Sequence, residues 1–109
     1  MTKKSLLLLG VLAMSILSIA SAKSYNIAFN SRITVGTEQL AAGEYTLKVE
    51  GSNAVFTNVN SNKSVTAPVK IENGDKKFGV TSVETAVEGG AEHIVDIQLG
   101  GSTTKLNFN

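Results

Sequence analysis

The sequence predicts an all-β fold: a small antiparallel β-sandwich or partly closed barrel of about seven strands, following an N-terminal signal peptide. Three observations support this prediction. Beyond residue 22, apolar and polar residues alternate in short segments, as in strands with one buried face. Glycine and asparagine turns interrupt these segments about every ten residues. No segment of useful length beyond residue 22 shows helical spacing of its apolar residues.

The first 22 residues have the features of a secretory signal peptide. Two lysines precede an apolar run over residues 6–19, and Ala20-Ser21-Ala22 supplies the small residues of a signal-peptidase site, with Lys23 as the first mature residue. A transmembrane anchor is the alternative, but a run of fourteen residues is too short to span a bilayer comfortably. We expect a secreted protein, periplasmic or extracellular, without stable membrane insertion after cleavage.

Residues 23–109 are expected to form a single β-sandwich-like domain without disulfides. The sequence contains no cysteine, which excludes thiol enzymes, disulfide exchangers and cysteine-ligated metal sites. Two of the ten basic residues lie in the leader, so cleavage leaves eight against nine acidic residues, with both signs interspersed. Because no basic run is available to follow phosphates, neither nucleic acid nor an anionic membrane surface is an expected partner.

The first half of the mature chain reads as three strands. Residues 24–35 alternate as one long strand or as two short ones bent near Asn30-Ser31. Residues 36–43 are expected to be a loop and the crossover between sheets. The clearest strand covers residues 44–50, and a third strand with ambiguous facing covers residues 54–59.

The second half continues with turns and alternating strands. Residues 65–72 alternate around Pro68, which predicts an edge strand or an outward-pointing proline, because proline has no N–H to donate. Asn73-Gly74 is the strongest hairpin signal, since a type I′ turn needs positive φ at both central residues. It leads to a predicted strand over residues 78–87, whose parity shift indicates a bulge near Thr81-Ser82. Two further strands, separated by glycine-rich turns, would complete what is largely a meander.

One motif carries a family resemblance. The pattern Ile33-x-Val35, followed by Leu40-x-Ala42-Gly43-x-Tyr45-x-Leu47-x-Val49, resembles small secreted bacterial all-β domains of uncharacterised function with an L-x-A-G-x-Y strand-entry motif. The resemblance extends loosely over the mature chain, and this motif is its specific part. It implies a sandwich-like fold in an envelope or extracellular setting, and it implies no catalytic residues.

The single histidine, His93, is the first candidate for chemistry. A histidine can serve as a general base or as a metal ligand. It has no second histidine or cysteine to work with, and both roles need partners in place. A surface or turn histidine is therefore the favoured interpretation.

Carboxylates on either side of the Gly89-Gly90 turn form the second candidate. Glu84, Glu88 and Glu92, together with His93, make up a candidate surface cluster, and Asp96 lies close by in the sequence. Several oxygens could hold Ca²⁺, but no Asp-rich loop of the usual spacing is present, which favours solvated strand faces. Alternation places Asp96 on the polar side of its strand, although its position between two apolar residues leaves an inward orientation open.

No catalytic residue, cofactor or metal ligand is therefore expected. The expected function is a secreted, non-enzymatic structural or binding module of the bacterial envelope or exterior, with a protein or glycan as its partner. The first alternative is a self-assembling subunit joined by edge-strand addition, with residues 24–35 as the donor strand. The second alternative, a small hydrolase, is disfavoured because His93 has no catalytic partners.

Overall fold

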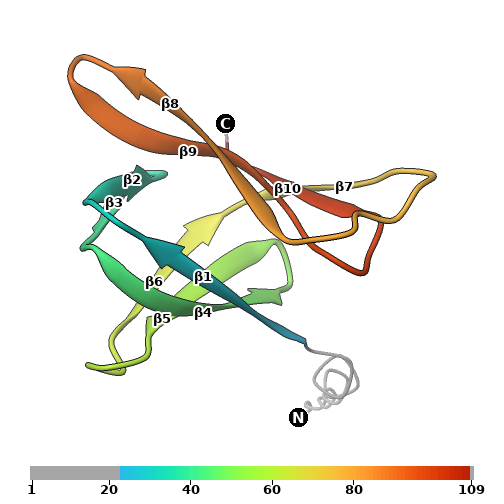
Figure 1. Ribbon diagram of the computed structural model, residues 1–109, viewed down its shortest axis with the longest axis horizontal. Helices are drawn as coiled ribbons and strands as arrows, with labels where there is room; N and C mark the ends of the chain where they lie inside the picture. The colour runs from blue at the N-terminus through green and yellow to red at the C-terminus, as the bar shows by residue number, and fades with distance from the viewer. Residues whose placement is uncertain (1–22, 109) are drawn as a thin grey trace, which may run out of the picture.

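A computed structural model describes residues 23–108 and shows an all-β sandwich of two sheets (Figure 1). The predicted signal-peptide site at Ala20 and Ala22 lies outside the described residues. The ten strands are β1 (Ser24–Phe29), β2 (Ile33–Val35), β3 (Glu38–Leu40), β4 (Gly43–Glu50), β5 (Asn53–Asn58), β6 (Ser64–Pro68), β7 (Lys70–Asn73), β8 (Ser82–Glu88), β9 (Ala91–Gln98) and β10 (Thr104–Asn107). Across residues 23–108, no helix is long and apolar enough to cross a membrane.

The two sheets differ in size and connectivity. The first is antiparallel, with the order β1-β4-β5-β6. The second has the order β3-β2-β9-β10-β7, and β8 pairs with the other edge of β9. Both sheets keep open edges, so the molecule is a sandwich and not a closed barrel. The sandwich predicted from alternation is thus confirmed.

Residues 23–108 form ten strands rather than about seven, because the chain changes sheets inside predicted segments. Residues 24–35 divide into β1 in the first sheet and β2 in the second. The expected loop over residues 36–43 contains β3, and the return to the first sheet follows at Ala41-Ala42. Residues 65–72 divide at Val69 into β6 and β7, which also lie in different sheets. Alternation continues through the crossovers within 24–35 and within 65–72, so the sequence pattern does not reveal where these segments change sheets.

The prediction of a hairpin at Asn73-Gly74 is wrong. Neither residue takes a positive φ, and β7 pairs with the distant strand β10 instead of with the strand that follows it. The Gly74 N–H donates to the Thr103 carbonyl at 2.9 Å, which extends this ladder past the end of β7. The two-residue turn with both φ values positive is Gly89-Gly90, at 60° and 81°, and it joins β8 to β9. A long-range ladder has therefore overridden a local turn preference.

The strand predicted over residues 78–87 is shorter than expected. It begins at Ser82, and Phe78 contributes only an isolated bridge to Gly100. The register irregularity lies between Glu84 and Thr85, not at Thr81-Ser82. Glu84 pairs with Asp96 and Thr85 with Ile94, so the extra residue belongs to β9, and the predicted bulge position is wrong by a few residues.

The core lies between the two sheets and draws on both of them. Phe56 from the first sheet and Phe108 from the C-terminal end pack with ring centroids 6.1 Å apart. The largest fully buried side chains are Phe56, Leu40, Leu47, Ile94, Ile97, Leu106 and Val35. Ala54 and Phe56 are buried, which resolves the ambiguous facing of β5. Pro68 lies on the edge strand β6, as predicted.

The strand-entry motif holds the crossover from β3 to β4. Leu40 is buried at the end of β3, which anchors the short connection to the core. Gly43 takes a φ of 146°, a conformation that residues with a side chain rarely adopt. The buried Tyr45 donates its hydroxyl to the Ala41 carbonyl at 2.8 Å, so its side chain closes the turn that precedes it. The motif therefore encodes a sheet-to-sheet corner.

Candidate functional site

The structure does not gather the predicted surface cluster into one site. On β8, Glu84 is paired with Asp96, and Glu88 is paired with Ala91 next to the turn. Glu92 accepts hydrogen bonds from the Thr85 hydroxyl at 2.9 Å and the Ser31 hydroxyl at 3.5 Å. Among residues 23–108, no group of three or more histidine, cysteine or acidic side chains is arranged to hold a metal ion.

Asp96 is the one polar or charged residue buried in the described part of the chain, with 7% of its surface exposed. Its register partners are Glu84 on β8 and Asn107 on β10, so it lies on the polar side of β9, as alternation predicts. Burial raises the pKa of its carboxyl, and a hydrogen bond with Glu84 and the charge of Glu84 raise it further, while Lys105 lowers it in part. Asp96 therefore holds its proton more tightly than an isolated aspartate does.

His93 is half-buried where β9 meets β2. It is paired with Thr34 in parallel register on one side and with Ala86 on the other. An open hollow of about 400 Å³ lies beside it, and Glu88 and Phe108 are among its lining residues. Within residues 23–108, no second histidine or cysteine lies near His93 to complete a metal or catalytic site.

The free edges of the two sheets offer a different kind of site. Edge strands expose unpaired backbone N–H and C=O groups, and native proteins protect them with charged residues, proline or short length. In the described chain the edge strands are β1, β3, β6, β7 and β8. The last four carry such protection: β3 is three residues long, β6 contains Pro68, β7 contains Lys70 and Glu72, and β8 contains Glu84 and Glu88.

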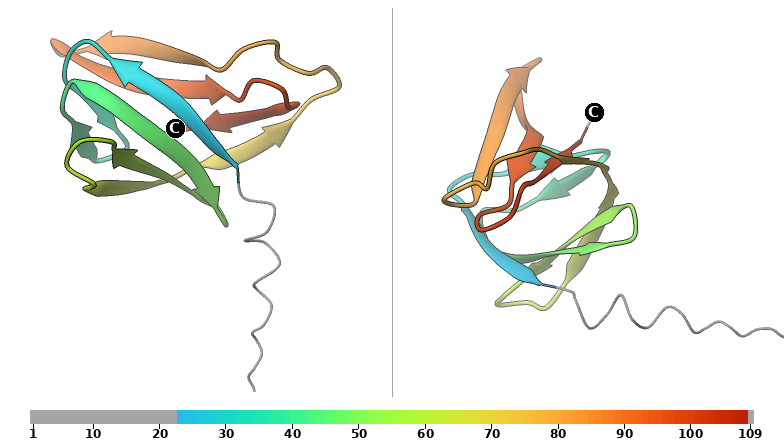
Figure 2. Two further views of the ribbon diagram at one scale, coloured as in Figure 1. Left: turned by 60° about the horizontal axis from the view of Figure 1, so that its bottom comes forward. Right: turned by 90° about the vertical axis from the view of Figure 1, so that its right-hand side faces the viewer.

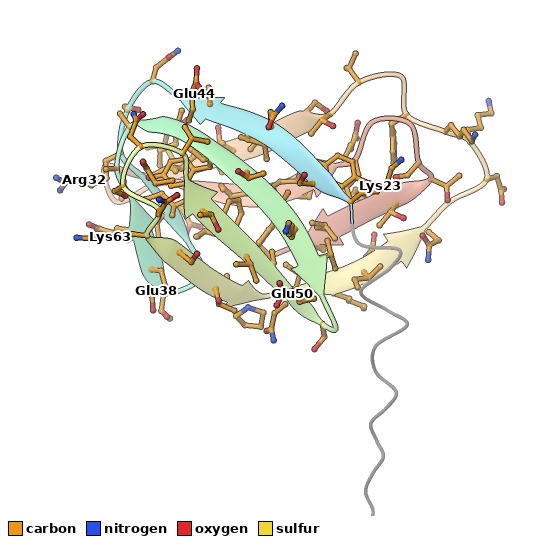
Figure 3. All side chains as sticks on the ribbon, turned by 90° about the horizontal axis from the view of Figure 1, so that it is seen from below. Lys23, Arg32, Glu38, Glu44, Glu50 and Lys63 are labelled. Carbon is orange, nitrogen blue, oxygen red and sulfur yellow. The ribbon has the colours of Figure 1, made fainter. Side chains whose placement is uncertain are left out.

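Strand β1 carries no protection of this kind. Its sequence, SYNIAF, has neither a charged residue nor proline and is rich in residues that favour strands. It pairs with β4 over its whole length and, within residues 23–108, with no other strand. Lys23 lies before the strand and Glu44 lies beside its far end, so the charges stand at opposite ends of β1 (Figure 3).

Hydrogen bonds in the first sheet show which backbone groups of β1 point outward. Glu44 accepts from the Val59 N–H at 3.0 Å on the β5 side. Because antiparallel bonding alternates along a strand, Tyr45 and Leu47 direct their backbone groups to β1, where they oppose Ile27 and Tyr25. The intervening residues Ser24, Asn26 and Ala28 therefore direct theirs to the free edge.

Two open hollows adjoin β1, and one of them lies at its free edge. One, of about 340 Å³, separates β1 from β8, the edge strand of the other sheet on the same side of the sandwich (Figure 2). Its lining includes Phe29, Ser31, Ile33, Val83, Thr85 and Glu92. The other, of about 360 Å³, lies over the face of the first sheet, against Ala28 of β1, Glu44 of β4 and Val59 after β5.

Asn26 and Ala28 lie within the donor strand predicted over residues 24–35, but nothing in the sequence distinguishes them from the rest of that segment. The absence of charge over residues 24–29 is visible in the sequence, but only the topology shows that this segment is an edge.

Comparison of the chain with protein-family models, with curated proteins and with solved structures found no match.

Proposed function

We propose that this protein is a secreted, non-enzymatic binding module of the bacterial envelope or exterior that recognises a polypeptide by strand addition to β1. In this mode of recognition, main-chain hydrogen bonds supply affinity and alternate side chains supply specificity. The observation that carries the proposal is the contrast between β1 and the other edge strands. Four edges are protected by charge, proline or shortness, and β1 alone among the described edges is bare.

A polypeptide partner is favoured over a glycan by the kind of groups that β1 offers. Glycan sites commonly use exposed aromatic rings as platforms, whereas Tyr45 is buried and Tyr25 is half-buried against the core. The outward-facing side chains of β1 are small or polar: Ser24, Asn26 and Ala28. An added strand would therefore meet hydrogen-bonding groups without a steric barrier.

The proposal can be tested with labelled nine-residue peptides of alternating valine and threonine, which serve as generic extended strands. Binding is measured by fluorescence anisotropy to the exported protein and to its Ala28→Pro variant. Proline removes an N–H that points away from β4 and leaves the β1–β4 ladder intact. We expect Ala28→Pro to weaken binding roughly tenfold, as loss of a backbone contact and a steric block would do.

The matched control is Thr66→Pro, which makes the same change on the opposite edge of the same sheet. The Asn58 N–H donates to the Lys63 carbonyl, so alternation turns the backbone groups of Thr66 outward from β6. This variant should bind as the wild type does. Absence of binding by every peptide at millimolar concentration, or equal binding by Ala28→Pro and wild type, would contradict strand addition at β1.

A further inference from the structure

We infer that the strand added to β1 is β1 of a second copy, so that two molecules form a twofold-symmetric dimer with one continuous sheet. The inference rests on the proposed function, because it names the occupant of the same edge. It is carried by three properties of β1: a self-complementary side-chain pattern, outward backbone groups in the matching register, and opposite charges at its two ends.

The side-chain pattern selects the register. Residues directly opposite in an antiparallel pair share a face, so the buried and exposed positions of the two strands must match. Two registers meet this condition with an equal overlap of five residues, one with Ile27 and one with Asn26 opposite its own copy. We choose the Ile27 register for the aromatic pairs that it forms. It sets Tyr25 opposite Phe29 of the second copy, both half-buried against the core, and aromatic pairs of this kind stabilise antiparallel strands. On the outer face, Asn26 then lies opposite Ala28 of the second copy.

The backbone groups agree with this register. Asn26 and Ala28 are the residues whose N–H and C=O groups point outward, and the register brings them together as hydrogen-bonded pairs on both sides of the twofold axis. Their side chains are exposed, and the hollow between β1 and β8 leaves space for a neighbouring strand beside Ala28. A second β1 would thereby satisfy the donors and acceptors that the monomer leaves to solvent.

The charges favour an antiparallel arrangement of two copies. Lys23 and Lys48 lie at the beginning of β1, since Lys48 is paired with Ser24, and Glu44 lies at its end beside Ala28. The twofold axis brings the basic end of each β1 to the acidic end of the other. A parallel arrangement would bring like charges side by side. Because the contact involves one short strand from each copy, we expect a weak association in the micromolar to millimolar range.

A pair of double variants tests the register with matched controls. Asn26→Lys with Ala28→Lys places like charges directly opposite each other twice in the dimer. Asn26→Lys with Ala28→Glu introduces equally many charged side chains at the same positions but places opposite charges across the interface. Each protein, exported from the full-length gene, is studied by sedimentation equilibrium up to about 1 mM, and thermal melts confirm that both variants fold.

We expect the wild type to dimerise, the Lys/Lys variant to associate roughly tenfold or more weakly, and the Lys/Glu variant to recover the wild-type constant or exceed it. Amide hydrogen exchange supplies a second measurement, because protection at Asn26 and Ala28 should rise with protein concentration. A wild type that stays monomeric at 1 mM, or equal association of the Lys/Lys and Lys/Glu variants, overturns the inference. If the wild type stays monomeric but binds the peptides, only the inference of a second copy is refuted. If it neither dimerises nor binds the peptides, strand addition itself is refuted.

Discussion

Gly100 is the position where a single added methyl group should damage the fold most directly. A Cβ at this residue would lie 2.6 Å from the Thr81 nitrogen, 2.6 Å from the Val80 carbonyl carbon and 2.9 Å from the Val80 Cα. Comfortable contacts between such atoms are about 3.5–4.0 Å, and these are backbone atoms that cannot rotate away. Gly100→Ala therefore requires the segment 78–81 to move by about 1 Å.

Three hydrogen bonds hold that segment against the β9–β10 turn. The Gly100 N–H donates to the Thr81 hydroxyl at 2.9 Å, the Gly101 N–H to the Phe78 carbonyl at 2.8 Å, and the Phe78 N–H to the Ser102 carbonyl at 2.9 Å. At about 1 kcal/mol each, their loss amounts to about 3 kcal/mol, which agrees with the upper part of the ~1–3 kcal/mol range for overpacking.

The assay is thermal unfolding followed by circular dichroism. For a domain of this size, a loss of about 3 kcal/mol lowers the Tm by roughly 12–24 °C. Gly79→Ala is the control, because an added Cβ there meets no atom within 4 Å and its φ is not positive; its Tm should change by no more than about 4 °C. Equal melting temperatures for Gly100→Ala and the wild type would refute the reasoning.

Two further changes probe the corner motif and the buried acid. Tyr45→Phe removes the hydroxyl that donates to the Ala41 carbonyl and should lower the free energy of unfolding by about 1 kcal/mol in urea titration; an unchanged value would show that this bond does not hold the corner. Asp96→Asn should raise the Tm at pH 7. Burial and Glu84 raise the pKa of the Asp96 carboxyl in the folded protein, so the charged carboxylate destabilises the native state at this pH. A raised pKa destabilises the native state above that pKa and has no effect well below the ordinary value, so the gain should shrink as the pH falls toward 4. Asp75→Asn, in an exposed loop, should show no comparable gain, and a pH-independent gain for Asp96→Asn would contradict the assignment.

Much of the fold could be predicted because alternation and turn chemistry are local. Strand β4 was recognisable from the alternation of Tyr45 and Leu47 with polar residues, and Pro68 marked an edge strand, because a missing N–H has the same consequence wherever the strand lies. The corner at Leu40 and Gly43 was likewise predicted, as part of a loop and crossover before that strand. These features depend on residues that are neighbours in the chain.

The candidate site depended on contacts that no local pattern contains. The uncharged stretch 24–29 was readable in the sequence, but its status as a free edge follows from pairing with β4 on one side only. Asp96 was correctly placed on the polar face, yet its burial results from the neighbouring strands that surround it. The members of the predicted cluster have different neighbours: Glu92 bonds to Thr85 and Ser31, whereas Glu88 and His93 line one hollow.

The sequence by itself determined that this protein is an all-β chain without cysteine, and it determined most of the strand faces. Tertiary structure decided which sheet each strand joins, as at Asn73-Gly74, where pairing of β7 with β10 overrides a strong turn signal. The physical reason is that a strand's alternation records only that one face is buried, and any partner of matching register can bury it. The ladder partners, and with them the one unprotected edge among the described strands, arise from the packing of the whole chain.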